Sequence, residues 1–151
     1  MDSLIRIATT EDATAISEVI IGALRETNAQ DYTPAIIEQV EQSFSPKAVS
    51  RLLTQRQVYV ATIEGHVVAT ASLDQDVVRS VFVDPAHQAK GIGKQLMARI
   101  HSAAVNGGVK LLRVPSSITA EGFYASLGFK KVRDEFNGAE RTIIMEQSLQ
   151  T

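Results

Sequence analysis

The sequence predicts an α/β fold, in which one mixed β-sheet carries helices on both faces. Three observations lead to this prediction. Apolar residues recur at helical spacing in some segments and form short strand-like runs in others, so the chain holds both kinds of element. The predicted elements follow the order strand, helices, three strands, helix, strand, helix and two strands. No repeat, low-complexity tract or linker divides the chain, so we expect residues 1–151 to form a single domain.

The first third of the chain is predicted to be mainly helical. After a short strand over 4–8, Thr9 can cap a helix that carries acidic residues in its first turn. Residues 25–31 are polar, and we expect a loop there. Thr33 and Ser45 each precede a proline, which is the arrangement of a capped helix with proline at its first position. Two more short helices are therefore expected.

The rest of the chain alternates between strands and helices. Glycine or proline marks several of the predicted boundaries. The expected elements are strands over 58–63 and 66–73 around a Glu64-Gly65 turn, a strand over 77–83 ended by Asp84-Pro85, a helix ended by Gly107-Gly108, a strand over 109–114 stopped by Pro115, a helix over 118–126, and strands over 129–132 and 141–146 joined through Asn137-Gly138.

Composition limits the classes of function. The 151 residues include no cysteine, which excludes disulfides, thiolate metal sites and cysteine nucleophiles. The net charge of −2 gives no reason to expect nucleic acid or an anionic membrane as a partner. The first residues lack a basic stretch followed by an apolar run, and no apolar segment approaches the roughly 18 residues of a membrane span. We therefore expect a cytoplasmic protein.

The turn after the strand over 77–83 has the features of an anion site. From Gln88 to Lys94 it holds two glycines, Gly91 and Gly93, directly before a predicted helix. The first N–H groups of a helix have no intrahelical partner, and together with the helix dipole they attract an anion. Glycine lets the backbone come close to that anion, and Lys90 and Lys94 add positive charge. We predict that this turn binds a phosphate-bearing ligand.

Spacing excludes two familiar phosphate-binding turns. A P-loop requires four residues between its first glycine and its Gly-Lys pair, and this stretch lacks that gap. A dinucleotide fingerprint requires a third glycine where this chain has Leu96, and an acid further on where residues 111–114 have none. A connection that binds nothing is the plain alternative for a bare Gly-x-Gly, but the flanking strand, the proline, the lysines and the amphipathic helix all argue against it.

Two blocks of the sequence resemble the Gcn5-related N-acetyltransferases. Residues 81–85 and 88–93 are similar to the acyl-CoA signature of that family: Arg or Gln, two residues, Gly, one residue, then Gly or Ala, after an apolar strand. Residues 120–129 resemble a second block of the family, at the family's order and separation. The resemblance implies a mostly antiparallel sheet with a central splay between the strands over 77–83 and 109–114, where the acyl group would sit.

The resemblance also implies acetyl-CoA as the acyl donor and no metal. Backbone N–H groups from Ala89 to Lys94 would hold the pyrophosphate, with Gln88 shaping the turn. The preceding strand would pair with the pantetheine arm like an added strand. Ser117 stands where the family often has an asparagine that reaches toward the coenzyme, and its side chain is shorter. The implied coenzyme residues are Val81, Phe82, Val83, Gln88, Ala89, Lys90, Gly91, Ile92, Gly93, Lys94 and Ser117.

Tyr124 matches the family tyrosine that faces the coenzyme sulfur, and the implied role is general acid. A phenol with an unperturbed pKa of about 10 is protonated at neutral pH and can donate to the leaving thiolate. The alternative is a core aromatic whose hydroxyl is satisfied. Direct transfer in a ternary complex is expected, because no cysteine can carry the acyl group.

The general base stays open. Many family members have a glutamate on the strand before the signature turn, but residues 77–83 contain no carboxylate. Asp74 and Asp76 just precede this strand and could act through water, although a role in the turn is more ordinary. A water chain or an amine that arrives neutral would serve instead. The histidines are expected at the surface or in packing, namely His66, His101 and His87.

The acceptor is expected between residues 25–32 and 135–140, as in the family. The candidate contacts are Glu26, Asn28, Asp31, Tyr32 and Glu135. The acids among them favour a cationic amine, although a solvated polar loop would look the same. The last two strands could alternatively form a homodimer interface.

Taken together, the sequence predicts an N-acetyltransferase that acts on a primary amine of a small molecule or peptide. A non-catalytic acyl-CoA sensor or regulatory module is the second hypothesis, motivated by Ser117 and the missing strand carboxylate. A structural phosphate site without coenzyme is the third.

Overall fold

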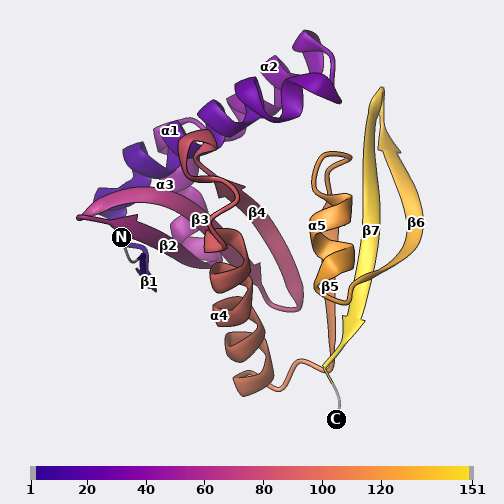
Figure 1. The fold of residues 1–151 in the computed structure, drawn as a ribbon. Coiled ribbons are helices and arrows are strands. Elements are labelled where there is room, and N and C mark those ends of the chain that lie inside the picture. Colours follow the sequence, from indigo (N-terminus) through magenta and orange to yellow (C-terminus); the bar gives the residue numbers. More distant parts are fainter. Residues whose placement is uncertain (1–2, 150–151) are drawn as a thin grey trace.

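The computed structural model describes residues 3–149, in which seven strands form one sheet of order β1-β2-β3-β4-β5-β7-β6 (Figure 1). The strands are β1 (Leu4–Ile7), β2 (Gln57–Ile63), β3 (His66–Asp74), β4 (Val77–Val83), β5 (Leu111–Ser116), β6 (Lys130–Asn137) and β7 (Glu140–Ser148). The helices are α1 (Ala13–Glu26), α2 (Pro34–Gln42), α3 (Pro46–Gln55), α4 (Ile92–Asn106) and α5 (Glu121–Ser126), with short 3-10 turns η1 (Thr10–Asp12), η2 (Asn28–Gln30) and η3 (Pro85–His87).

The sheet is antiparallel except where β4 meets β5. These two strands run parallel and share one residue pair, Val77 with Arg113, beside a backbone hydrogen bond of 2.9 Å from Arg113 N–H to Asp76 O. Beyond that point they diverge, and β5, β7 and β6 lean away from the first four strands (Figure 1). The predicted central splay in a mostly antiparallel sheet is confirmed.

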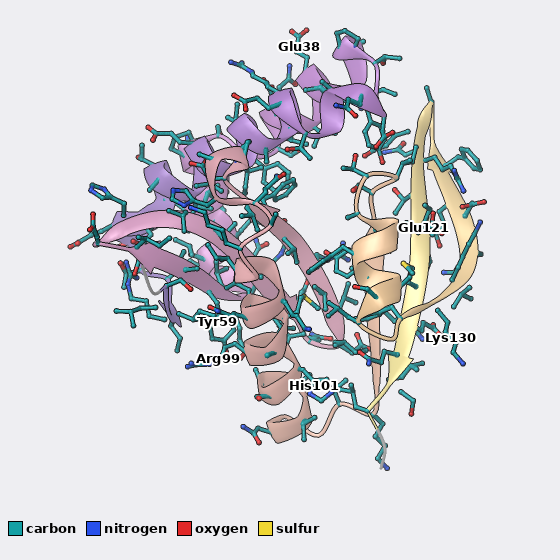
Figure 2. The ribbon with its side chains drawn as sticks, viewed as in Figure 1. Glu38, Tyr59, Arg99, His101, Glu121 and Lys130 are labelled. Atoms are coloured by element: carbon teal, nitrogen blue, oxygen red, sulfur yellow. The ribbon has the colours of Figure 1, made fainter. Side chains whose placement is uncertain are left out.

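Helices cover both faces of the sheet, as predicted. Successive residues of β2 point to opposite faces: Val58 and Val60 pack with α1, α2 and α3, whereas Tyr59 and Ala61 pack with α4 and α5. On the α4 face the ring of Tyr59 also lies beneath the Arg99 guanidinium, 5.3 Å from the ring centroid (Figure 2). The two cores sandwich the sheet and fix the positions of β4 and of the turn that follows it.

The predicted starts of α2 and α3 are confirmed. The Thr33 hydroxyl oxygen accepts from Ile36 N–H at 3.3 Å, and the Ser45 hydroxyl oxygen accepts from Ala48 N–H at 3.2 Å. A side-chain acceptor satisfies an N–H group that the helix itself cannot. These two caps stabilise the first turns of the short helices α2 and α3.

Pro115 does not stop β5, as the sequence suggested, but lies inside it. Its neighbour Arg113 donates its N–H toward β4, and by strand alternation the Pro115 nitrogen faces the same edge. The splay leaves no strand partner on that edge, so the missing N–H group costs no ladder hydrogen bond. The proline is therefore compatible with β5 at this one position.

Several other boundaries also differ from expectation. The predicted loop over 25–31 is partly helical, because α1 continues to Glu26 and η2 follows. The helix predicted over 118–126 starts later, because Ala120 N–H closes a turn on Ser117 O at 3.2 Å before α5 begins. The last two strands are longer than predicted, since their pairing continues almost to the turn at Gly138.

His66 and His101 are exposed, as expected (Figure 2 labels His101). Within residues 3–149, no helix has the length and apolar character needed to cross a bilayer.

Asp12 links the start of α1 to β1 through hydrogen bonds. Its carboxylate accepts both terminal nitrogens of Arg6, at 2.8 and 2.9 Å, and the Thr9 N–H at 2.7 Å. Asp12 is 8% exposed. The Arg6 hydrogen bonds lower the pKa of Asp12 from 3.8 to about 2. Because the folded-state pKa is the lower one, the stabilisation is present above the unfolded pKa and is lost as the pH falls toward 2.

We therefore expect Asp12→Asn to lower the free energy of unfolding by about 1–2 kcal/mol at pH 7, with Arg6 partly screened by solvent. The difference from the parent protein should shrink between pH 5 and 2. Urea unfolding across this pH range measures it. Glu11→Gln, at the exposed neighbouring position, is the control and should change little. A deficit that stays constant down to pH 2 would contradict the ion-pair explanation.

Candidate active site

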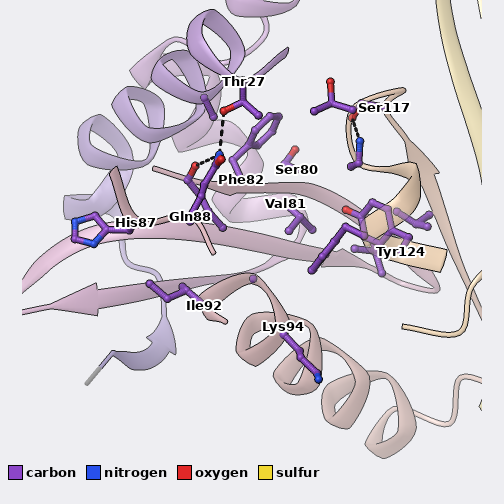
Figure 3. Close-up of a pocket in the computed structure, with 18 of the residues that line it drawn as sticks. Thr27, Ser80, Val81, Phe82, His87, Gln88, Ile92, Lys94, Ser117 and Tyr124 are labelled. Carbon is purple, nitrogen blue, oxygen red and sulfur yellow. Dashed lines mark hydrogen bonds between the residues drawn. The ribbon is translucent and has the colours of Figure 1, made fainter. Parts of the chain in front are cut away.

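A cavity of about 570 Å³ lies where β4 and β5 diverge (Figure 3). We call it the first cavity. Its walls come from the end of α1, from β4, from the turn into α4, and from the segment that joins β5 to α5. The volume is within the usual range of small-molecule and cofactor sites. All but one of the implied coenzyme residues line it, namely Val81, Phe82, Val83, Gln88, Ala89, Gly91, Ile92, Gly93, Lys94 and Ser117.

The turn into α4 presents backbone N–H groups without protein partners. The first helical bond runs from Gln95 N–H to Gly91 O at 3.0 Å, and among the described residues the amides of 89–94 donate to no protein acceptor. Ala89 and Gly91 have φ of 64° and 79°, a left-handed conformation that changes the direction of the chain twice. Lys94 lines the first cavity, whereas Lys90 does not and instead approaches His87 Nδ1 at 3.3 Å. The turn can therefore receive an anion.

Gly93 also has a packing role that the sequence did not reveal. A Cβ atom there would lie 3.3 Å from Phe123 Cζ and 3.6 Å from Val83 Cγ2, so a side chain would press on α5 across the first cavity. Gly93 thus allows α4 and α5 to approach closely, whereas Gly91 provides the left-handed turn.

Gln88 holds the turn to the end of α1. Its Nε2 donates to Thr27 Oγ1 at 2.9 Å and to Val83 O at 3.3 Å (Figure 3). The implied role of Gln88, shaping the turn through its side chain, agrees with this geometry. His87 is half-buried in η3 and lines the cavity.

A bulge in β4 is a feature that the sequence did not reveal. Thr70 pairs with Phe82 and Ser72 pairs with Arg79, so Ser80 and Val81 together face one residue of β3. Ser80 has a φ of 56°, unusual for a residue other than glycine. A bulge interrupts the ladder and redirects backbone groups. It lies beside the first cavity, where an extended ligand could pair with the strand, and no glycine marked it.

Tyr124 is 4% exposed and lines the first cavity. Its ring makes edge contacts with Phe123 and Phe129, at centroid distances of 5.2 and 5.7 Å. No hydrogen bond of its hydroxyl is found among the described residues, and the hydroxyl points to the side of Val81 (Figure 3). Burial raises the pKa of Tyr124 above its usual range, so the phenol keeps its proton at neutral pH.

A second cavity of about 290 Å³ adjoins the first. Both include Ser80, Phe82, Pro115 and Ser117 in their walls, so they meet at the splay. Apolar residues of α1, α2 and the loop before α3 form much of the second cavity. Its charged wall residues are Arg56, Arg79 and Glu140. The Ser117 hydroxyl oxygen accepts from Ala120 N–H at 3.2 Å, so it also stabilises the turn before α5.

The structure places the predicted acceptor residues in different environments. Tyr32 lines the second cavity, and its hydroxyl accepts from Ile118 N–H at 2.6 Å and donates to Arg141 O at 3.4 Å. Burial raises the pKa of Tyr32. Asp31 accepts from the Thr119 hydroxyl at 2.8 Å and is outside both cavity walls.

Glu26 and Glu135 are exposed and line neither cavity. Glu135 lies 2.7 Å from Arg133. The side chain of Asn28 lies outside the described part of the structure. The structure therefore does not bring these acids into the wall of either cavity.

Sequence reasoning missed Arg56 and Arg79, and it included Glu140 only as the end of the expected acceptor segment 135–140. Arg79 is the one charged residue in the strand over 77–83, and this signal could have identified it. Arg56 and Glu140 stand at element boundaries, where charge is ordinary. Asp74 and Asp76 line neither cavity. Among the described residues, no group of three or more potential metal ligands occurs.

An open splay that leads from unpaired helix amides to a buried phenol suits a transferase with an elongated, phosphate-bearing acyl donor. Comparison with known proteins gives the particular family. Residues 28–145 match the family model described as the acetyltransferase (GNAT) domain, and the chain belongs to this family, the Gcn5-related N-acetyltransferases. It is accordingly an N-acetyltransferase that uses acetyl-CoA, as predicted.

Individual relatives agree with this assignment. The uncharacterized N-acetyltransferase YafP of Escherichia coli (strain K12) is 27% identical over 124 residues, which cover 82% of this chain and 79% of YafP. A Gcn5-related N-acetyltransferase structure from Rhodopseudomonas palustris has a TM-score of 0.92 at 22% identity, covering 98% of this chain and 96% of its own. The PaiA N-acetyltransferase of Thermoplasma acidophilum, solved in complex with coenzyme A, has a TM-score of 0.83 at 20% identity, covering 98% and 99%. At these identities the solved structures support the fold alone.

We expect Gly93→Val to weaken coenzyme A binding at least about tenfold, because the new side chain pushes Phe123 into the first cavity. Calorimetry measures the dissociation constant. Gly122→Val is the matched control, since a Cβ at Gly122 meets nothing within 4 Å. Equal affinities of the two variants for coenzyme A would show that the close approach of α4 and α5 is unimportant for binding.

Proposed function

We propose that the protein transfers the acetyl group of acetyl-CoA directly to a primary amine in the second cavity, with Tyr124 as general acid. The observation that carries this proposal is the common wall of the two cavities at the splay. An acyl donor in the first cavity and an amine in the second would meet there without a covalent carrier. Such proximity supplies a large part of the rate enhancement in two-substrate reactions.

The first cavity fits the donor in two ways. The amides of 89–94 suit the pyrophosphate, and Lys94 adds positive charge at the same end. The bulge at Ser80 and Val81 interrupts the β3 ladder beside the cavity, which suits backbone pairing with an extended pantetheine arm. Acetyl-CoA supplies the activated thioester, and the chain supplies binding, orientation and a proton.

Tyr124 would protonate the leaving thiolate. The amine nitrogen forms a bond to the acetyl carbon, the carbon–sulfur bond breaks, and the sulfur takes the phenolic proton. A buried tyrosine whose pKa is raised is protonated before this step. The amine nitrogen loses one proton as the amide forms, and this proton restores the phenol. Within residues 3–149 the Tyr124 hydroxyl has no hydrogen-bond partner, and its place in the first cavity supports this role.

Glu140 is the carboxylate that we assign to the amine. Among the described residues it is the one carboxylate that lines the second cavity. A carboxylate there can attract an ammonium group and accept its proton, directly or through water. The missing strand carboxylate, which motivated the hypothesis of a non-catalytic sensor, is then no longer an argument against catalysis.

Three further predictions go with this proposal. Residues 1–151 are expected to form one N-acetyltransferase domain, which is supported by the single sheet and by the family match over 28–145. A cytoplasmic location stays a prediction. So does a homodimer through β6 and β7, for which the exposed Val132 and Phe136 offer apolar surface.

Tyr124→Phe keeps the ring and its edge contacts but removes the proton donor. We expect kcat to fall about 10²–10⁴-fold while coenzyme A affinity stays nearly unchanged. Thiol release from acetyl-CoA and calorimetry measure the two quantities. Tyr59→Phe is the matched control, because Tyr59 is a buried phenol outside the first cavity and bonded to Gln57. Turnover of Tyr124→Phe at the parental rate would exclude Tyr124 as the acid.

Glu140→Gln keeps the shape of the side chain and removes its charge. We expect kcat/KM for the amine to fall at least about tenfold at pH 7, since the ammonium loses its counterion and proton acceptor. Glu135→Gln is the control, because Glu135 is exposed and lies outside the second cavity. Similar values of kcat/KM in the two variants would remove Glu140 from the mechanism.

A further inference from the structure

We infer that the acceptor is a small amine that also carries a carboxylate, and that Arg56 and Arg79 bind this carboxylate in the second cavity. The inference rests on the proposed function, since it names the substrate class of the same site. It adds a negative group to the cationic amine expected from the sequence, and the acids behind that expectation lie outside both cavity walls.

Arg56 brings a guanidinium group with unused donors to the second cavity. It stands between α3 and β2, is half-buried, and forms one hydrogen bond, from Nη1 to Ser80 Oγ at 3.2 Å. Within residues 3–149 it has no ion pair closer than 4.0 Å. A guanidinium has five N–H donors in a planar fork, so most of its donors remain available for a bound group.

Arg79 places a second positive charge on the same cavity, from β4. Its ion pair with Asp74 is long, at 3.6 Å, and both side chains are about two-fifths exposed, at 40% and 38%. A pair of this kind contributes little energy and does not neutralise the site. Burial and the charge of Arg79 both lower the pKa of Arg56, so the two guanidinium groups repel one another. A bound carboxylate would relieve that repulsion.

The opposite wall carries the complementary charge. Glu140 is at the start of β7, across the splay from Arg79 on β4. The remaining walls are apolar or neutral. Two positive groups on one side and one negative group on the other match a molecule with a carboxylate and an ammonium. A volume of about 290 Å³ suits a molecule of the size of a free amino acid.

A purely structural role of the arginines is the plainer alternative, and it leaves part of the arrangement unexplained. The Arg56 contact with Ser80 can stabilise the bulge in β4. That contact does not involve Arg79, whose charge, together with burial, lowers the pKa of Arg56. A structural role for Arg56 at the bulge does not explain why Arg79, which takes no part in that contact, lies on the wall of the same cavity.

The test uses matched pairs of amines, each an amino acid and its own carboxamide, over the common side chains. Calorimetry with the coenzyme A-loaded protein measures binding, and thiol release from acetyl-CoA measures kcat and KM. The carboxamide is the less basic amine and is more often neutral, so a preference for the amino acid cannot come from amine reactivity. We expect at least one amino acid to exceed its carboxamide by about tenfold or more in affinity and in kcat/KM.

Two variants assign the preference to the arginines. In Arg79→Gln, the ratio of kcat/KM for the amino acid to kcat/KM for its carboxamide should fall close to one, mainly through a change in KM. Arg56→Lys keeps the charge but loses the fork, and should reduce the ratio partly. Arg113→Gln is the matched control, because Arg113 pairs with Glu146 at 3.1 Å outside the second cavity, and its ratio should equal that of the parent.

The outcomes separate this inference from the proposed function. Ratios near one for every pair, or a preference that persists in both arginine variants, would overturn the carboxylate site while leaving acetyl transfer intact. Absence of thiol release with every amine would instead count against the proposed function. In that case the binding ratio still decides on the carboxylate site.

Discussion

The separation of β4 from β5 is the constraint on which the rest of the structure depends. Two parallel neighbours share one residue pair, Val77 with Arg113, and then diverge, so backbone groups that would pair across a continuous sheet are left open. Unpaired backbone groups away from water are costly, and a sheet tolerates them where a ligand can bind. Both cavities lie at this divergence and share four wall residues. In the proposed mechanism, the splay is the place where donor and acceptor meet.

Several local features fit a splayed sheet better than a continuous one. Pro115 lies in a strand at a position whose nitrogen faces the open edge. Ser80 holds a left-handed conformation within β4, beside the Arg56 hydrogen bond. Gly93 permits α4 to approach Phe123. A strained backbone such as that of Ser80 is found most often at functional sites, where the surrounding structure maintains it. The three residues come from separate segments, yet all border the same opening.

The sequence was sufficient for the fold class, and most of the residues that it predicts for the donor line the first cavity. The capped starts of α2 and α3, each with proline at its first position, and the turn around Gly91 are local signals, and the structure agrees with them because local geometry decides them. The acceptor side depends on contacts between distant segments. Arg56, Arg79 and Glu140 meet only after the sheet has formed, and no spacing in the sequence relates them. The acids near residues 26 and 135 were plausible by proximity in the chain, but they face solvent. The bulge at Ser80 was missed because no glycine marks it.

The most direct measurement is amide hydrogen exchange by NMR, with and without coenzyme A. If the splay and the turn form the donor site, the amides of residues 89–94 and of Val81 should exchange at least about tenfold more slowly in the complex, because they gain acceptors from the ligand. Amides of β6, on the far edge of the sheet, should be unchanged. Protection confined to other parts of the sheet, with residues 81 and 89–94 unaffected, would contradict the assignment of the splay as the donor site.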